Sequence, residues 1–96
     1  MTYTTMAQVK RAHRAQGWKF FDNQTMKFWG SKVHGEVRGG KFFITSEDNY
    51  DRTARLFTIR CIDEAGMIDT VGEFQAHATL EDAISELVDV MAGAKA

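Results

Sequence analysis

Lysine followed by two aromatic residues occurs three times within 25 residues of this chain, at residues 19–21, 27–29 and 41–43. Seven of the eleven aromatic residues lie between positions 18 and 43, so recognition chemistry would concentrate there. Aromatic rings stack on nucleobases and fill the centres of protein interfaces, while neighbouring lysines neutralise phosphates. The three triplets are therefore the first candidates for a binding surface.

The two rings of each triplet would point to opposite faces of a strand, because side chains alternate along it. If the triplets are strands, the second ring of each lies on the face that carries the lysine. That face is either a binding platform or a surface covered by another element. The candidate binding residues on it are Lys19, Phe21, Lys27, Trp29, Lys41 and Phe43.

A polar loop over residues 46–53 adds two candidate contacts, Tyr50 and Arg52. Its acids do not follow the EF-hand pattern, which needs a glycine and a distal bidentate glutamate in register. A solvated hairpin loop stabilised by Asn and Asp is the plainer interpretation. Loops carry function disproportionately, however, and Tyr50 is an aromatic residue in an otherwise polar segment.

Catalytic chemistry finds little support in the residue types. His13, His34 and His77 lie in three different expected elements, without the spacing of a zinc site. The lone Cys61 alternates with apolar residues, as a small buried hydrophobe does, and no GxSxG or P-loop string occurs. We therefore predict a protein that is not an enzyme and holds no metal or cofactor.

A basic helix is expected over about residues 5–16. Thr5 and Gln8 form a capping-box pair, and Gly17 suits the position just after the last turn. The apolar stripe of this helix is thin, and Lys and Arg occupy much of the rest. Such a helix is held by one narrow edge and shows charge to solvent.

An amphipathic helix is expected near the end of the chain, because apolar residues recur at helical spacing from Leu80 to Met91. Thr79 serves as its N-cap, acids in its first turn suit the helix dipole, and Gly93 follows its end. The outer face is acidic. That is typical of a solvated helix, although the same charges could mimic an array of phosphates.

Antiparallel strands should fill the middle of the chain. A glycine turn at residues 38–40 predicts a hairpin, and a turn at 63–66 separates two later strands. The expected strands cover residues 18–21, 33–37, 41–46, 55–62 and 67–75, the first of them short.

The segment over residues 22–30 has two interpretations. Its Lys-aromatic-aromatic triplet fits a strand. Asp22 could instead cap a short helix that Gly30 ends, and the triplet would then be helical.

Together these elements predict one α+β domain over residues 1–96. It has an N-terminal helix, a four- to five-stranded antiparallel sheet and a C-terminal amphipathic helix packed on the sheet. If both helices cover one sheet face, the other is bare and the second ring of each triplet is exposed. If the helices lie on opposite faces, the rings are core. The candidate binding surface depends on the first arrangement.

Composition places the chain among ordinary globular proteins, with 44% hydrophobic and 26% charged residues. No apolar run approaches the roughly 18 residues that a membrane span needs, and the first residues do not resemble a signal peptide. A single cysteine fits a reducing compartment, so we expect a cytoplasmic protein that does not interact with membranes.

The net charge of −1 conceals an uneven distribution. Residues 1–45 carry eight Lys or Arg and two Asp or Glu, a balance of +6, whereas residues 46–96 carry four and eleven, a balance of −7. The molecule is bipolar unless the fold interleaves the two halves, as adjacent strands often do.

Several strings together carry a resemblance: FFD-x2-TMKFWGS over residues 20–31, FITSE-x2-Y over 43–50, R-x-FTIR over 55–60 and TVGEF over 70–74. This pattern resembles small uncharacterised proteins encoded by phages and their relatives. The resemblance implies a short protein made in the host cytoplasm during infection. Proteins of that format often bind and block a host machine, and anti-CRISPR proteins are one such class.

We interpret the chain as a non-enzymatic, macromolecule-binding protein, a phage-type inhibitor or adaptor that docks on a host protein or nucleoprotein complex. The alternative is a single-stranded nucleic-acid-binding module that uses a Lys/aromatic sheet face. The pI near 6.3 is low for such a module, because nucleic-acid-binding domains are usually basic. An exposed aromatic face could equally pair with a second copy and form a homodimer.

Overall fold

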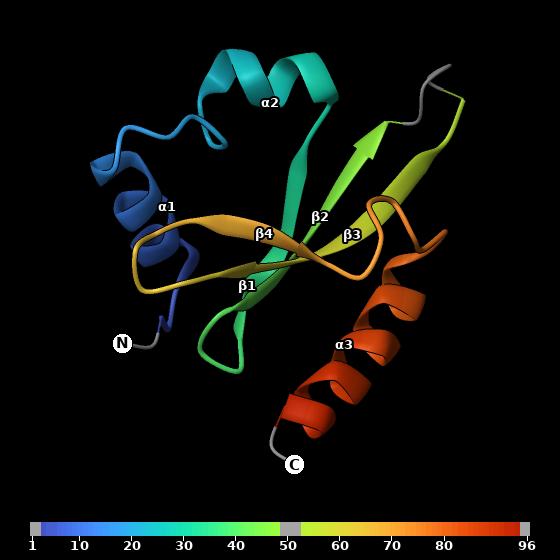
Figure 1. Ribbon diagram of the computed structural model, residues 1–96. Coiled ribbons are helices and arrows are strands. Elements are labelled where there is room, and N and C mark those ends of the chain that lie inside the picture. Colours follow the sequence, from blue (N-terminus) through green and yellow to red (C-terminus); the bar gives the residue numbers. More distant parts are fainter. Residues whose placement is uncertain (1–2, 49–52, 95–96) are drawn as a thin grey trace.

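Three helices and four strands make up the part of the chain that the computed structural model describes, residues 3–48 and 53–94. In chain order they are α1 (Met6–Ala15), α2 (Asn23–Trp29), β1 (Lys32–Arg38), β2 (Phe42–Asp48), β3 (Arg55–Ile62), β4 (Ile68–Val71) and α3 (Leu80–Ala94). This is the predicted α+β fold, with an additional short helix between α1 and the sheet (Figure 1). Tyr50 and Arg52 lie outside the described residues.

The sheet is an antiparallel meander in the order β1-β2-β3-β4, so every strand pairs with its neighbour in sequence. The strand predicted over 55–62 is confirmed in full as β3. β4 is shorter than the expected 67–75. It ends at Val71 because Gly72 and Gln75 have positive φ angles of 76° and 56°, which are incompatible with extended backbone.

The strand expected over residues 18–21 is wrong. Phe20 N–H donates to His13 Nε2 at 3.1 Å, and Asp22 N–H donates to Lys19 O at 3.1 Å. These backbone groups therefore form a turn and a side-chain contact, and they add no fifth strand to the described sheet.

β1 carries a bulge opposite β2. His34 pairs with Ile44 and Arg38 pairs with Phe42, so four steps along β1 correspond to two along β2. Gly35, at φ +78°, supplies the left-handed conformation that this irregularity needs.

The predicted N-terminal helix is confirmed as α1. Thr5 Oγ1 accepts a hydrogen bond from Gln8 N–H at 3.3 Å, and Gly17 follows the last turn at φ +83°. The Gln8 side chain reaches back one residue further than a standard capping box, because its Oε1 accepts from Thr4 N–H at 2.7 Å.

His13 on α1 is buried and ties the helix to two other segments. Its Nδ1 lies 2.8 Å from the carbonyl oxygen of Gly66, and its Nε2 accepts from Phe20 N–H. These two partners require a neutral ring with the proton on Nδ1. The ring therefore links α1 to the turn between β3 and β4 and to the loop before α2.

Residues 23–29 form a helix, which decides between the two interpretations of the segment over 22–30. Asp22 Oδ2 accepts from Gln24 N–H at 3.2 Å, and Gly30 ends the helix at φ +64°. The strand interpretation of the second triplet is therefore wrong. No residue of α2 is buried.

α3 packs on the sheet as predicted, with Ala83 and Leu87 fully buried. Thr79 Oγ1 accepts from Asp82 N–H at 3.1 Å and caps the helix. The helix continues to Ala94, so Gly93 lies within its last turn and not beyond its end.

The two long helices cover opposite faces of the sheet (Figure 1). Alternation along β2 sends Phe43 into the core under α1, while Phe42 and Ile44 enter the core under α3. The bare sheet face on which the candidate binding surface depended is therefore absent among the described residues.

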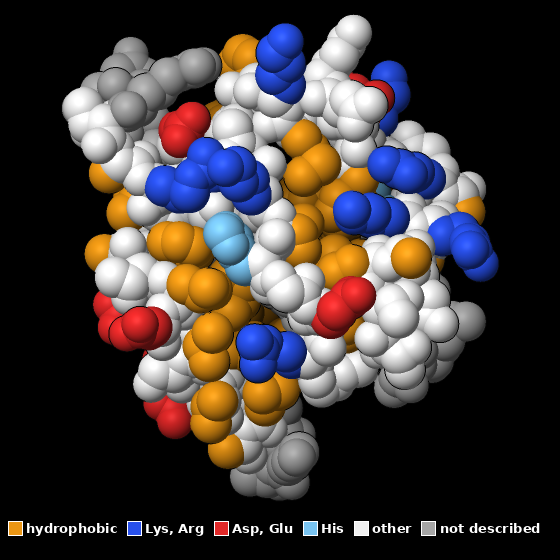
Figure 2. All heavy atoms as spheres, turned by 180° about the vertical axis from the view of Figure 1, so that it is seen from behind, with side chains coloured by type: hydrophobic (Ala, Val, Ile, Leu, Met, Phe, Trp, Pro, Cys, Tyr) orange, Lys and Arg blue, Asp and Glu red, His pale blue; other side chains and the backbone are white. Residues whose placement is uncertain are grey.

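The two long helices carry opposite charge on opposite faces of the sheet. α1 carries Lys10, Arg11 and Arg14 and no acid, whereas α3 carries four acids and no base. Figure 2 shows Lys and Arg spread over this face, several of them on the α1 side, and acids along the outer side of α3. The molecule is bipolar across its sheet.

Candidate binding site

Two of the predicted binding residues are core. Phe21 is 1% exposed and Phe43 is 0% exposed, and both pack in the cluster under α1. The prediction that they contact a partner is wrong, because α1 and the loop before α2 cover the sheet face that Phe43 occupies.

The other predicted residues that the structure describes are exposed but do not form one face. Lys19 precedes α2, Lys27 lies within it, and Trp29 at its end is 52% exposed. Lys41 lies at the β1–β2 turn, with its Nζ 5.2 Å from the ring centroid of Phe42. Phe28, whose ring the strand interpretation directed away from the lysines, is the most exposed large hydrophobic residue, at 68%.

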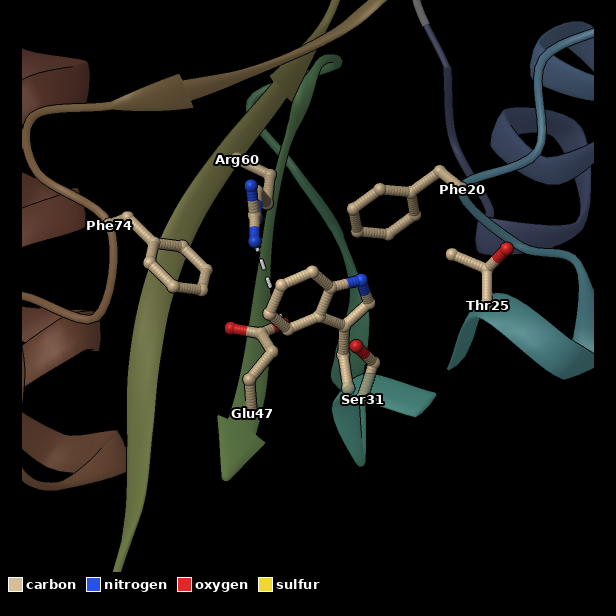
Figure 3. A pocket seen from close by; sticks show the side chains of 7 residues that line it. Phe20, Thr25, Ser31, Glu47, Arg60 and Phe74 are labelled. Carbon is tan, nitrogen blue, oxygen red and sulfur yellow. Dashed lines mark ion pairs between the residues drawn. The ribbon is translucent and has the colours of Figure 1, made fainter. Parts of the chain in front are cut away.

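A pocket of about 220 Å³ lies where the loop before α2, α2 itself, β2, β3 and the segment after β4 meet (Figure 3). We call it the Arg60 pocket. Its lining residues are Phe20, Thr25, Trp29, Ser31, Glu47, Arg60 and Phe74. The structure thus brings one ring from the first triplet and one from the second to the same site.

Arg60 is held between two aromatic rings in this pocket. Its guanidinium carbon lies 5.2 Å from the ring centroid of Phe20 and 5.3 Å from that of Phe74. Its Nε donates to Thr45 Oγ1 at 3.2 Å and its Nη1 to Thr70 Oγ1 at 2.9 Å. Burial lowers the pKa of Arg60, and the ion pair with Glu47 opposes that shift.

Glu47 faces Arg60 from β2, and Figure 3 shows the two side chains pointing toward each other. Its Oε1 accepts from Thr58 Oγ1 at 3.2 Å. Its Oε2 lies 3.6 Å from Arg60 Nη2, which is an ion pair but is too long for a hydrogen bond. Glu47 is 2% exposed, and Oε2 is the buried side-chain atom without a hydrogen-bond partner in the described structure.

Sequence reasoning missed Glu47, Arg60, Phe20 and Phe74. A signal for the charged pair was present. Arg60 and Ile62 are two residues apart in β3, so their side chains lie on the same, inward face of the strand. A charged residue on the core-facing side of a strand requires a partner. Register was the missing information, since Thr45 pairs with Thr58 and the side chains of Glu47 and Arg60 meet over that pair.

A second polar cluster joins β1, β2 and the end of α2. Ser46 Oγ lies 2.6 Å from His34 Nε2, a contact of the kind that activates a serine nucleophile. Ser46 is fully buried, however, and Arg55 Nη1 donates to the same oxygen at 2.9 Å and to Gly30 O at 2.7 Å. The arrangement is that of a structural link, and the geometry shows no reacting position beside the hydroxyl.

Cys61 is half-buried against the core under α3. Burial raises the pKa of its thiol, and the neighbouring Asp69 carboxylate raises it further. The thiol form is therefore favoured, which agrees with its interpretation as a small hydrophobe.

Within residues 3–48 and 53–94, no three His, Cys, Asp or Glu side chains come together as a metal would require. Over the same residues, no helix combines the length and the apolar character that crossing a membrane demands.

Comparison with known proteins gives a family match. A search of curated proteins and a search of solved structures each returned nothing similar. A protein-family model matches residues 5–88, which span α1, α2, the whole sheet and the first part of α3. The chain therefore belongs to the family of unknown function DUF7447.

Proposed function

We propose that this protein is a non-enzymatic binding protein that docks on a host protein, or on a nucleoprotein complex, through the aromatic surface of α2. That surface, the α2 patch, consists of Phe28, Trp29 and Phe74 with Lys27 beside them. The observation that carries the proposal is the exposure of Phe28 at 68% and Trp29 at 52%, side by side on a helix with no buried residue.

The rings of the α2 patch are arranged as an anchor for a partner. Phe28 and Trp29 are in edge-to-face contact, with centroids 5.1 Å apart, and Phe74 is 49% exposed across the Arg60 pocket from Trp29. Large rigid rings that remain in water in the free protein release that water when a partner covers them. Such residues dominate the centres of interfaces.

The partner surface that fits the α2 patch is apolar with an acidic rim. Lys19 and Lys27 are exposed on the same segment and favour carboxylates around the apolar contact. The resemblance to small phage-encoded proteins supports a host protein in the cytoplasm as the partner, and inhibition, as by anti-CRISPR proteins, as the outcome of docking.

The nucleic-acid alternative loses its sheet face, because Phe21 and Phe43 are buried. It retains Trp29 with Lys19 and Lys27, so any direct contact with a strand would use the same segment as protein docking.

The test compares the loss of an exposed apolar side chain from the α2 patch with the loss of one from α3. Phe28→Ser removes an exposed ring from the α2 patch, and Val88→Ser removes an exposed side chain (54%) from α3. A host protein that co-purifies with the chain is identified, purified and titrated with each variant. We expect Phe28→Ser to weaken binding at least about tenfold and Val88→Ser to leave it unchanged.

Equal binding by the wild type and both variants would contradict the proposal. Sedimentation velocity on the isolated protein covers the remaining case: a dimer that Phe28→Ser converts to monomer would make a second copy the occupant of the α2 patch.

A further inference from the structure

The floor of the Arg60 pocket holds a carboxylate oxygen that accepts no hydrogen bond from the described residues. Glu47 Oε2 accepts no hydrogen bond in the described structure, although the side chain is almost entirely buried and its other oxygen is bonded to Thr58. A carboxylate oxygen in the interior without a hydrogen bond is costly even beside a cation, since a buried acceptor loses the hydrogen bonds of water. A ligand that brings an N–H group to this oxygen would relieve that cost.

A donor lies beside this acceptor. The hydrogen bonds of Arg60 to other described residues come from Nε and Nη1, and its Nη2 lies 3.6 Å from Glu47 Oε2 without a hydrogen bond to it. A ligand edge that carries an N–H group next to an acceptor atom would engage both groups. Glu47 and Arg60 also neutralise each other, so the floor favours a neutral ligand edge.

The walls of the pocket are flat and its volume is small. Phe20, Trp29 and Phe74 supply aromatic rings, and Thr25 and Ser31 supply hydroxyl groups. A volume of about 220 Å³ is below the 300–1,000 Å³ typical of pockets for drug-sized molecules, so it suits one small planar ring system. Aromatic walls hold such a ring by stacking.

Positive charge lies along the segment that forms one side of the pocket. Lys19 directly precedes Phe20, Lys27 lies two residues before Trp29, and both lysines are exposed. Exposed lysines at this position favour a ligand with an anionic group outside the pocket. The combination of a neutral planar ring with an adjacent anion is that of a nucleotide.

We propose that the Arg60 pocket binds one nucleobase, whose edge meets Glu47 and Arg60 and whose face stacks on the Trp29 ring. Every nucleobase carries an N–H donor next to an acceptor, which matches the floor. A side-chain amide offers the same two groups but has no ring to stack. The base can come from a free nucleotide or from a single-stranded segment of nucleic acid, because both present the same chemistry.

Entry of the base requires a small rearrangement of the lining. Glu47 Oε2 has less than 1 Å² of accessible surface, so a ligand reaches it only after neighbouring side chains shift. Trp29 and Phe74 are about half exposed and are the lining aromatics least constrained by packing. Their rotation opens the pocket without changing the sheet.

The test titrates the ¹⁵N-labelled protein with the four ribonucleoside monophosphates and, separately, with short single-stranded oligonucleotides. The indole N–H signal of Trp29 reports on the pocket, and that of Trp18 is the internal control. We expect the Trp29 signal to move with a dissociation constant on the order of 0.1 mM for mononucleotides. Tighter binding of oligonucleotides that weakens with salt would identify a strand as the source. Equal binding would identify the free nucleotide.

Variants on and off the pocket test the assignment, with binding followed through the backbone amide signals so that loss of an indole does not remove the readout. Trp29→Ala should weaken nucleotide binding about tenfold or more, because stacking on an aromatic ring is lost, while Val88→Ala, exposed on α3 and outside the pocket lining, leaves it unchanged. Glu47→Gln, whose fold is checked by its NMR spectrum, should weaken binding about tenfold and change the ranking of the four bases.

The proposal is overturned if the Trp29 signal of the wild type stays in place at millimolar nucleotide, or if Val88→Ala weakens binding as much as Trp29→Ala does. Loss of binding to a protein partner in Glu47→Gln, without any nucleotide binding by the wild type, would also overturn it and would assign the pocket to a protein side chain. Docking through Phe28 is tested separately by Phe28→Ser, since Phe28 does not line the pocket.

Discussion

The His34 ring on β1 lies between the hydroxyl of Ser46 and the ring of Phe57, whose centroid is 5.0 Å away. Burial lowers the pKa of His34 from 6.5, the positive charges of Arg55 and Lys32 lower it further, and Glu47 raises it. The folded protein therefore favours the neutral ring, to which the Ser46 hydroxyl can donate.

This shift predicts a loss of stability on mild acidification. The unfolded chain takes up a proton at His34 near pH 6.5, whereas the folded chain takes it up at a lower pH. The free energy of unfolding should therefore have its full His34 contribution above pH 6.5, fall as the pH drops below that value, and level off below the lowered pKa. Urea unfolding followed by circular dichroism between pH 5 and 8 measures this contribution.

His34→Gln is the control, because it removes the titrating group and keeps a polar side chain. All other charged groups are the same in both proteins, so the difference between the two curves isolates His34. Parallel curves over the whole range would contradict the assignment.

At the scale of elements, α2 depends on how it ends. Gly30 has φ +64°, and a Cβ atom built there would collide with the Asp48 carboxylate, with Cγ 2.9 Å away. The same residue provides the carbonyl that accepts from Arg55 Nη1. The end of the helix that carries Phe28 and Trp29 is therefore fixed against the sheet by a backbone position that favours glycine.

We predict that Gly30→Ala lowers the free energy of unfolding by about 2 kcal/mol, from left-handed strain plus displacement of Asp48. Gly17→Ala is the matched control. Gly17 has φ +83° with nothing within 4 Å of its Cβ position, so it carries only the strain, about 1 kcal/mol. Denaturant unfolding of both variants tests this, and equal losses would show that the Asp48 contact costs nothing.

Elements with strong local signals were predictable from sequence. Strict alternation marked β3 to the residue, and caps at Thr5 and Thr79 marked the starts of α1 and α3. The residues at 18–21 misled the prediction, because their aromatic content favours a strand, whereas the turn and the contact of Phe20 with His13 are tertiary.

The faces of the sheet could not be assigned from local pattern. Both Phe42 and Phe43 are apolar, so β2 has no polar face to indicate where water lies, and two helices on opposite faces bury both rings. The Arg60 pocket could not be predicted for the same reason. Its residues come from separate segments, and they meet only when the helices lie on opposite faces of the sheet.

The whole molecule separates its charge across the sheet, since α1 carries three bases on one side and α3 carries four acids on the other. A net charge of −1 hides this. At low ionic strength and pH 7 we predict that the protein binds to both cation and anion exchangers, because each resin contacts one side of the molecule.

Variants on one helix should affect one resin. Arg11→Ala on α1 should lower the salt concentration that elutes the protein from the cation exchanger and not weaken its retention on the anion exchanger. Glu86→Gln on α3 should do the reverse, and both side chains are exposed. A protein that flows through the cation exchanger would contradict the bipolar surface.

The bulge in β1 also limits what the open side of the sheet can do. β1 is an outer strand, and an incoming extended chain would need a regular ladder of free N–H and C=O groups along it. The two extra residues between His34 and Arg38, with Gly35 in a left-handed conformation, break that ladder halfway. Exposed charges at Lys32 and Arg38 stand at its two ends. The irregularity therefore acts against edge-to-edge growth of a fibril from this margin.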